Sequence, residues 1–249
     1  MSSQDMSNSP TDPHSPRGTV SLNDEDNVRR ILSDTLFGLW ATVNNLSRLR
    51  PSKRDRYRVT VFGSARPDPQ HWVYQRVKTM CAELSALGCD IVTGGGPGLM
   101  RAANEGAREG AGGGQSIGIR VDLPFEQEVN PFVMQAFEHE SFFTRLHQFV
   151  LMSDAYIVAP GGIGTVLETM MIWQLLQVRH LQDTPLILVG PMWQGLVDWA
   201  RAQMLRPGFE LAGAKDLEIP KCVEDAEQAI TLVKKHHAGW KAARDASAR

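Results

Sequence analysis

Cysteine is rare in this chain, and the spacing of the cysteines does not match that of a typical metal-binding or redox motif. The 249 residues contain three cysteines, Cys81, Cys89 and Cys222, an odd number without C-x-x-C spacing. This disfavours a disulfide-stapled scaffold and a cysteine-built zinc site, and it is typical of a reducing cytosol. The sequence therefore predicts a cytoplasmic protein.

A large excess of one charge is also missing, and aromatic residues are few. Lys and Arg number 26 against 28 Asp and Glu, a formal net charge of −2, and Phe, Trp and Tyr make up 7% of the residues. Proteins that coat nucleic acid or anionic membranes usually carry a basic excess, and base-stacking surfaces need aromatic side chains. We therefore expect neither nucleic acid nor a membrane as a partner.

Long apolar runs are absent as well. No stretch of about 18 apolar residues occurs, so no membrane-spanning helix is expected, and the N-terminus lacks the apolar region of a secretory signal. Residues 1–24 are rich in Ser, Pro, Asp and Asn, which predicts a disordered tail. Apolar residues at steps of three and four then predict an N-terminal helix over residues 25–50.

Short apolar segments alternate with longer amphipathic segments through the rest of the chain. The predicted strands are 57–62, 90–92, 116–119, 133–137, 155–159 and 185–189. The predicted helices are 70–87, 98–109, 142–152, 165–178, 193–204 and 223–236. This alternation predicts an α/β fold, a Rossmann-like parallel sheet with helices on both faces, preceded by the N-terminal helical extension.

Three glycine-containing loops follow predicted strands: a first loop at Gly63–Arg66, a second at Thr93–Met100 and a third at Pro160–Thr165. Parallel sheets covered by helices bind ligands beyond the carboxyl ends of their strands, and a helix N-terminus binds anions. The second and third loops run into predicted helices, which predicts a phosphate or a nucleotide phosphate there. Neither matches GxGxxG or GxxxxGK[ST], so NAD-binding and P-loop sites are disfavoured. Tight turns without a ligand are the alternative.

Two charged residues lie near the third loop. Glu168 either holds a carboxylate over a ligand or closes a capping box with Thr165 at the start of the helix. Arg145 begins the preceding helix among apolar neighbours, where a positive charge is unfavourable, so we predict a role beyond solvation, with a surface salt bridge as the alternative. His236 and His237 are predicted to be solvated. No metal-ligand spacing occurs, so a metal site is not expected. The reaction considered below is expected to need no cofactor.

The loops carry a family resemblance. The motifs GGGPGLM at Gly94–Met100 and PGGIGTVLE at Pro160–Glu168 resemble the "Lonely Guy" (LOG) family, whose signature is PGGxGTxxE and whose members were long labelled lysine decarboxylases. The segments Ser116–Ile119 and Leu123–Asn130 are similar to the same family. We therefore expect a Rossmann-like LOG domain over residues 57–238.

The resemblance implies a homodimer that hydrolyses the N-glycosidic bond of a purine nucleoside 5′-monophosphate. The substrate would be a cytokinin riboside 5′-monophosphate or AMP, and the products the free base and ribose 5-phosphate. The implied catalytic pair is Arg145 and Glu168, and Leu146 stands where the family usually has a lysine. The residues that we expect to bind the substrate are Ser64, Gly95, Gly96, Met100, Gly161, Gly162, Gly164 and Thr165.

Two other readings stay open. Relatives with a similar phosphate architecture bind molybdenum cofactor, so a non-catalytic nucleotide or molybdenum-cofactor carrier is the main alternative. A nucleotide-sensing module that reports through the N-terminal extension is the second. The presence of both Glu168 and Arg145 favours the enzyme, because a carrier has no need of this pair.

Overall fold

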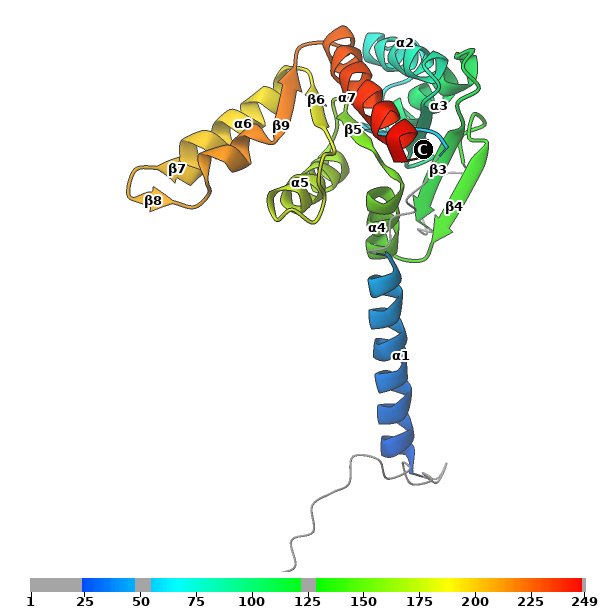
Figure 1. Cartoon of the computed structure of the whole chain (residues 1–249), viewed down its shortest axis with the longest axis vertical. Helices are drawn as coiled ribbons and strands as arrows, with labels where there is room; N and C mark the ends of the chain where they lie inside the picture. Colours follow the sequence, from blue (N-terminus) through cyan, green and yellow to red (C-terminus); the bar gives the residue numbers. More distant parts are fainter. Residues whose placement is uncertain (1–23, 48–54, 122–128, 248–249) are drawn as a thin grey trace, which may run out of the picture. The chain divides into compact units, whose positions relative to one another are not determined.

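The chain divides into two units, Met1–Arg50 and Pro51–Arg249. The computed structural model describes residues 24–47, 55–121 and 129–247 (Figure 1). In the first unit, helix α1 spans Glu25–Ser47. Its start is stabilised by Asp24, whose Oδ1 accepts the backbone N–H of Asn27 (3.2 Å). The predicted disordered tail, except for its last residue, lies outside the described residues.

A seven-stranded parallel sheet organises the second unit, in the order β4-β3-β2-β1-β5-β6-β9. The strands are β1 Arg58–Phe62, β2 Asp90–Thr93, β3 Ser116–Val121, β4 Gln135–His139, β5 Ala155–Val158, β6 Leu186–Val189 and β9 Pro220–Val223. Every residue of β2 and β5 is buried, as expected for central strands covered on both faces. The predicted Rossmann-like α/β fold is confirmed.

Helices cover both faces of the sheet (Figure 1). One face carries α2 (Trp72–Ala86), α3 (Leu99–Glu109) and α7 (Ala226–Ser247), and the other carries α4 (Phe142–Met152), α5 (Ile163–Gln177) and α6 (Pro191–Met204). Neighbouring side chains of β1 point to opposite faces, so Val61 packs in the first core and Phe62 in the second. None of the described helices has the length and apolar character needed to cross a bilayer.

The strand order reverses between β1 and β5. From β1 the chain builds the sheet outward through β2, β3 and β4, then returns to the other side of β1 and continues through β5, β6 and β9. The two central strands pair in register from Val59 with Ala155 to Phe62 with Val158. Their carboxyl ends therefore lie side by side, with loops that diverge to opposite halves of the sheet.

The C-terminal part of the fold differs from the predicted elements. Strand β9 and the short hairpin of β7 (Leu205–Arg206) and β8 (Phe209–Glu210) were not predicted, and α7 begins at Ala226 rather than at residue 223. Strand β9 starts with Pro220, which lacks a backbone N–H. A proline is tolerated there because β9 is an edge strand that pairs only with β6.

The prediction that His236 and His237 are solvated was wrong. His237 is 6% exposed, and its ring centroid lies 4.9 Å from that of Tyr57. His236 Nδ1 hydrogen-bonds with the Tyr57 hydroxyl (2.6 Å), and its Nε2 lies 2.6 Å from the Asp183 carbonyl oxygen. The polar sequence of α7 did not indicate that the helix packs against the start of β1.

Candidate functional site

Three loops meet at the carboxyl ends of β1, β2 and β5. The backbone N–H of Ser64 in the first loop donates to the carbonyl of Pro160 (3.1 Å), which begins the third loop. The Ser64 carbonyl accepts the N–H of Leu99 in the second loop (2.8 Å). The first loop is thus bonded to both of the others. Doubly wound sheets bind ligands where the strand order reverses, so this is the expected place for a site.

A buried polar network holds the second loop in place. The Thr93 hydroxyl accepts the N–H of Gly95 (2.9 Å) and donates to Asn104 Oδ1 (2.7 Å). Asn130 Nδ2 donates to the carbonyls of Gly95 (3.1 Å) and Gly96 (3.0 Å) and to Asn104 Oδ1 (2.9 Å). These loop groups are satisfied within the protein, which makes the second loop a fixed wall.

The third loop, in contrast, opens into free space. Helix α5 begins at Ile163 with Gly162 as its N-cap and no capping side chain. A Cβ atom added to Gly162 or Gly164 would meet nothing within 4 Å, and Ile163 is 87% exposed. The first N–H groups of α5 are therefore available at the positive end of the helix. This arrangement suits an anion such as a phosphate.

The predicted start of α5 at Thr165 was wrong by two residues, and this overturns the capping-box alternative. Thr165 is the third helical residue and is 4% exposed, and its carbonyl accepts the Thr169 hydroxyl (2.7 Å). Because Gly162 is the N-cap, Glu168 lies in the second turn, beyond the N3 position that a capping box requires. A Cβ on Gly161 would clash with the Thr165 side chain, so only glycine fits beside this hydroxyl.

Arg145 and Glu168 form a buried ion pair. Arg145 Nη2 lies 4.0 Å from Glu168 Oε1, and the two side chains are 9% and 14% exposed. Arg145 Nε also donates to the carbonyl of Ile119 (3.0 Å), and its guanidinium lies over the ring of Phe149 (5.6 Å to the centroid). The surface salt bridge considered for Arg145 is therefore wrong, because the guanidinium is anchored below the surface.

The burial of Glu168 changes its acidity. Desolvation raises the pKa of Glu168 to about 7, and the positive charge of Arg145 acts in the opposite direction. A carboxyl group with a pKa near neutrality can both hold and release a proton at physiological pH, which is the property of a general acid or base. Strongly perturbed carboxyl groups in such positions are typical of functional sites.

Of the residues expected to bind the substrate, Met100 lies near Arg145, with the glycines of the second loop between them. A Cβ on Gly94 would clash with Arg145 Nη2 and lie 2.7 Å from Met100 Sδ, and a Cβ on Gly96 would lie 2.9 Å from Met100 Cε. Glycines of the second loop thus let Met100 and Arg145 approach the backbone. Ser64 joins the loops through its backbone, while its hydroxyl accepts the N–H of Arg66 (3.2 Å).

The sequence did not single out two residues that support the site. Asn130 belongs to a segment already noted for its family resemblance, but its bonds to the second loop were not foreseen. His139 ends β4, and its pKa is lowered by burial and by the charge of Arg145. Leu146 is 9% exposed, so the position of the family's usual lysine is apolar and buried here. Among the described residues, no three His, Cys, Asp or Glu side chains are grouped to hold a metal ion.

Sequence comparison assigns the family. The model of a family described as "Possible lysine decarboxylase" matches residues 100–233, more than half of the chain. The chain belongs to this family. The residues matched to the possible lysine decarboxylases include Arg145, Glu168 and the whole third loop. No curated protein matches the sequence.

Solved structures share the fold at low sequence identity. A molybdenum cofactor binding protein from the phototrophic bacterium Rippkaea orientalis has 21% identity and a TM-score of 0.56, over 74% of this chain and 98% of that chain. The molybdenum cofactor carrier protein from Chlamydomonas reinhardtii has 20% identity and a TM-score of 0.54, over 74% and 99%. Both likenesses concern the fold of this member of the possible lysine decarboxylase family.

Proposed function

We propose that this protein hydrolyses the N-glycosidic bond of a purine nucleoside 5′-monophosphate, releasing the free base and ribose 5-phosphate. The observation that carries the proposal is the buried Glu168 carboxyl, with its pKa near 7, paired with Arg145 and less than two turns from the open start of α5. The family assignment and the LOG-like motif support the same reaction. The substrates that the resemblance implies are cytokinin riboside 5′-monophosphates and AMP.

The third loop supplies the phosphate site in this proposal. The first N–H groups of α5 bind the 5′-phosphate without a side-chain cap to displace. Fixing the phosphate holds the ribose over the buried pair, so binding energy from a remote group aligns the reacting carbon. The second loop, held by Asn130 and covered by Met100, forms the wall against which the nucleotide packs.

Glu168 has two connected roles in the reaction. When the bond between C1′ and the base nitrogen breaks, the bonding electron pair leaves with the base. Positive charge then develops on the ribose, as in glycoside hydrolysis. The Glu168 carboxylate stabilises this charge and accepts a proton from the water that attacks C1′. The departing base gains a proton from solvent, and Arg145 orients the carboxylate.

Incubation with a panel of nucleoside 5′-monophosphates is the direct test. The purified full chain is expected to release free base and ribose 5-phosphate from at least one purine member, as measured by chromatography. The panel includes AMP and isopentenyladenosine 5′-monophosphate, so the same assay identifies the preferred base. Absence of product from every purine nucleotide would reject the proposal.

The Glu168→Gln variant separates catalysis from carriage. The amide keeps the size of the side chain but cannot accept the proton, so we expect kcat to fall at least about a hundredfold. AMP affinity measured by calorimetry is expected to survive, because the third loop is unchanged. Glu83→Gln, at an exposed position of α2, is the matched control. Tight nucleotide or molybdenum-cofactor binding without turnover in the wild type would favour the carrier instead.

We also propose that the active protein is at least a dimer that uses α5. On this helix Leu167 is 50% exposed, and Met170, Met171, Leu175 and Leu176 are only partly buried. An apolar helix surface of this kind needs cover from a second subunit. Trp173 of the same helix is buried within the chain and donates its indole N–H to the Asp216 carbonyl (2.7 Å), so it is not part of this surface. Sedimentation that gives only monomer at micromolar concentration would contradict the dimer.

A further inference from the structure

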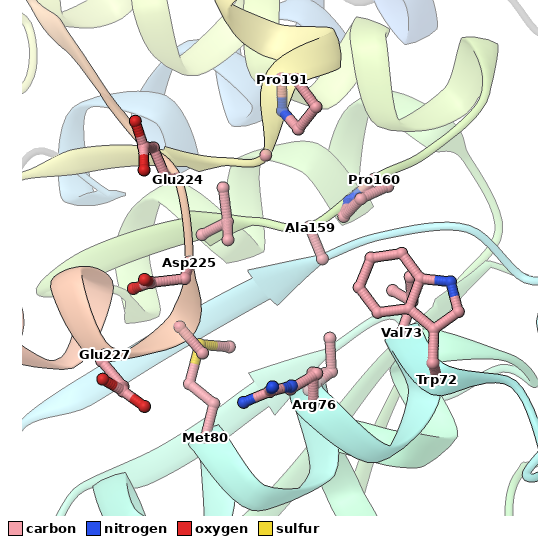
Figure 2. A pocket seen from close by; sticks show the side chains of 14 residues that line it. Trp72, Val73, Arg76, Met80, Ala159, Pro160, Pro191, Glu224, Asp225 and Glu227 are labelled. Carbon is pink, nitrogen blue, oxygen red and sulfur yellow. The ribbon is translucent and has the colours of Figure 1, made fainter.

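A cavity lies beside Pro160, where the third loop begins. It has a volume of about 300 Å³ and is bounded by the start of α2, the start of α6 and the turn between β9 and α7 (Figure 2). Val77 and Met80 from α2 and Ala159 and Pro160 from the end of β5 form part of its apolar wall. The catalytic pair proposed above does not line it. The cavity is therefore separate from the reacting centre, although it shares Pro160 with the third loop.

Charges of opposite sign stand on two sides of this cavity. Arg76 extends from α2, while Glu224 and Asp225 come from the β9–α7 turn and Glu227 from the first turn of α7 (Figure 2). Among residues 55–121 and 129–247, no ion pair joins Arg76 to a carboxylate. One oxygen of the Asp225 carboxylate already has a partner within the protein, because Oδ1 accepts the N–H of Gln228 at the start of α7 (2.9 Å). The guanidinium and the two glutamate carboxylates remain available to a ligand.

We propose that this cavity binds a free α-amino acid with an apolar or aromatic side chain. The ligand's carboxylate pairs with Arg76, since a guanidinium forms two parallel hydrogen bonds with a carboxylate. Its ammonium group faces Glu224 and Glu227, and its side chain packs on Val77 and Met80. Small-molecule sites combine apolar walls with a few polar groups in this way, and about 300 Å³ is at the small end of their volumes.

Other ligand classes leave part of the cavity unmatched. A nucleotide phosphate is disfavoured, because three carboxylates face one guanidinium and would repel a dianion. A simple organic cation would satisfy the carboxylates and stack on Trp72, but it would leave Arg76 without an anion. A zwitterion with an apolar body matches both charges and the wall together.

Calorimetric titration of the full chain with phenylalanine and leucine tests this assignment. We expect saturable binding of at least one of the two, and an affinity at least tenfold lower for its methyl ester and for its N-acetyl derivative. Each derivative removes one of the two charges, so the comparison tests both sides of the cavity. No binding at millimolar concentration, or equal binding of the free amino acid and both derivatives, would overturn the assignment.

Variants locate the binding in this cavity. Arg76→Met is expected to weaken binding of the free amino acid at least tenfold but to leave binding of the methyl ester unchanged, since the ester lacks the partner of Arg76. Arg108→Met, at an exposed position of α3 outside the cavity, is the matched control. Loss of affinity in both variants, or in neither, would contradict the proposal. No nucleotide is present in these titrations, so their outcome is independent of the proposed hydrolysis.

Discussion

The second and third loops are both rich in glycine, yet the structure uses them in opposite ways. In the second loop, the carbonyls of Gly95 and Gly96 are bonded to Asn130 and the N–H of Gly95 to Thr93, and glycine is needed where Met100 and Arg145 come close. In the third loop, Gly162 and Gly164 have nothing near them. One loop is filled by the protein itself and the other leaves room for a ligand.

This difference shows how glycine content alone misleads. A glycine removes a Cβ either because a protein atom occupies its place or because a ligand does, and only the surroundings tell which. The polar groups of the second loop are paired within the chain, so that loop contributes stability and shape. The N–H groups at the start of α5 have no side-chain cap, so they can donate hydrogen bonds to an anion bound at the third loop.

The largest expected effect compares one glycine from each loop. Gly98 has φ of +66°, and a Cβ there would clash with the Ser64 carbonyl oxygen, so Gly98→Ala should lower the free energy of unfolding by about 4 kcal/mol or more. Gly164→Ala should change it by at most about 1 kcal/mol, because it adds a better helix former in open space. Urea unfolding measures both, and similar losses in the two variants would break the comparison.

Gly164→Ala also has an expected effect on the ligand. Its methyl group enters the space assigned to the phosphate, so AMP affinity should fall although stability does not. An unchanged dissociation constant in calorimetry would mean that the open space is not a phosphate site.

The next effect concerns Glu168, in the helix that follows the third loop, and the pH dependence of the free energy of unfolding. Because the pKa of Glu168 rises from 4.5 to about 7 on folding, the folded chain holds a proton that the unfolded chain has lost between these values. This contribution lowers the free energy of unfolding by about 3 kcal/mol as pH rises from 4.5 to above 7. The Glu168→Gln variant lacks this pH-dependent loss. The free energy of unfolding of the variant, relative to that of the wild type, should therefore rise by about 3 kcal/mol between pH 4.5 and 8. Urea titrations at both pH values, with Glu83→Gln as the control, check the prediction; parallel curves would contradict it.

A substrate that lacks the phosphate tests whether the third loop binds this group. Adenosine lacks the group that we propose the third loop binds, so its kcat/KM should be about a hundredfold below that of AMP, or roughly 3 kcal/mol of transition-state binding. Initial rates of adenine release from both compounds give the ratio. Equal rates would show that the third loop does not anchor the substrate.

The smallest expected effect concerns the filled loop. Asn130→Ala removes four side-chain hydrogen bonds, three donated by Nδ2 and one that Oδ1 accepts from the N–H of Phe132, which should lower the free energy of unfolding by about 2 kcal/mol. Asn130→Asp keeps the size but loses the donors, so a similar loss is expected. Thermal or urea unfolding provides the measurement. A wild-type midpoint in both variants would show that the network is not what fixes the loop.

The sequence predicted the central strands well because their residues carry a continuous apolar signal. Ile91 and Val92 in β2, and Ala155 to Val158 in β5, are buried on both faces, and such runs have few other interpretations. Helix α4 was predicted with both ends correct, since Ser141 caps it and accepts the N–H of Thr144 (3.3 Å). These elements reflect local signals that the sequence contains.

Other features depend on distant partners and could not be predicted. The start of α5 was misplaced because Gly164 has a low helix propensity, yet it lies in the first turn. The surroundings of Arg145 come from Ile119 and Phe149, and the raised pKa of Glu168 follows from burial that only the packed helices create. Edge strand β9 was hidden by its leading proline, Pro220.

The link made by Ser64 has a consequence for how this protein can change over generations. Its N–H and carbonyl tie the third loop to the second, and neither bond uses the side chain. Every residue type except proline can supply that N–H, so the frame of the three loops tolerates replacement at this position. Mutation at position 64 can therefore change the side chain that stands between the second and third loops while the backbone bonds persist. Such a position is a natural point of divergence, where related chains can acquire different preferences without first losing their architecture.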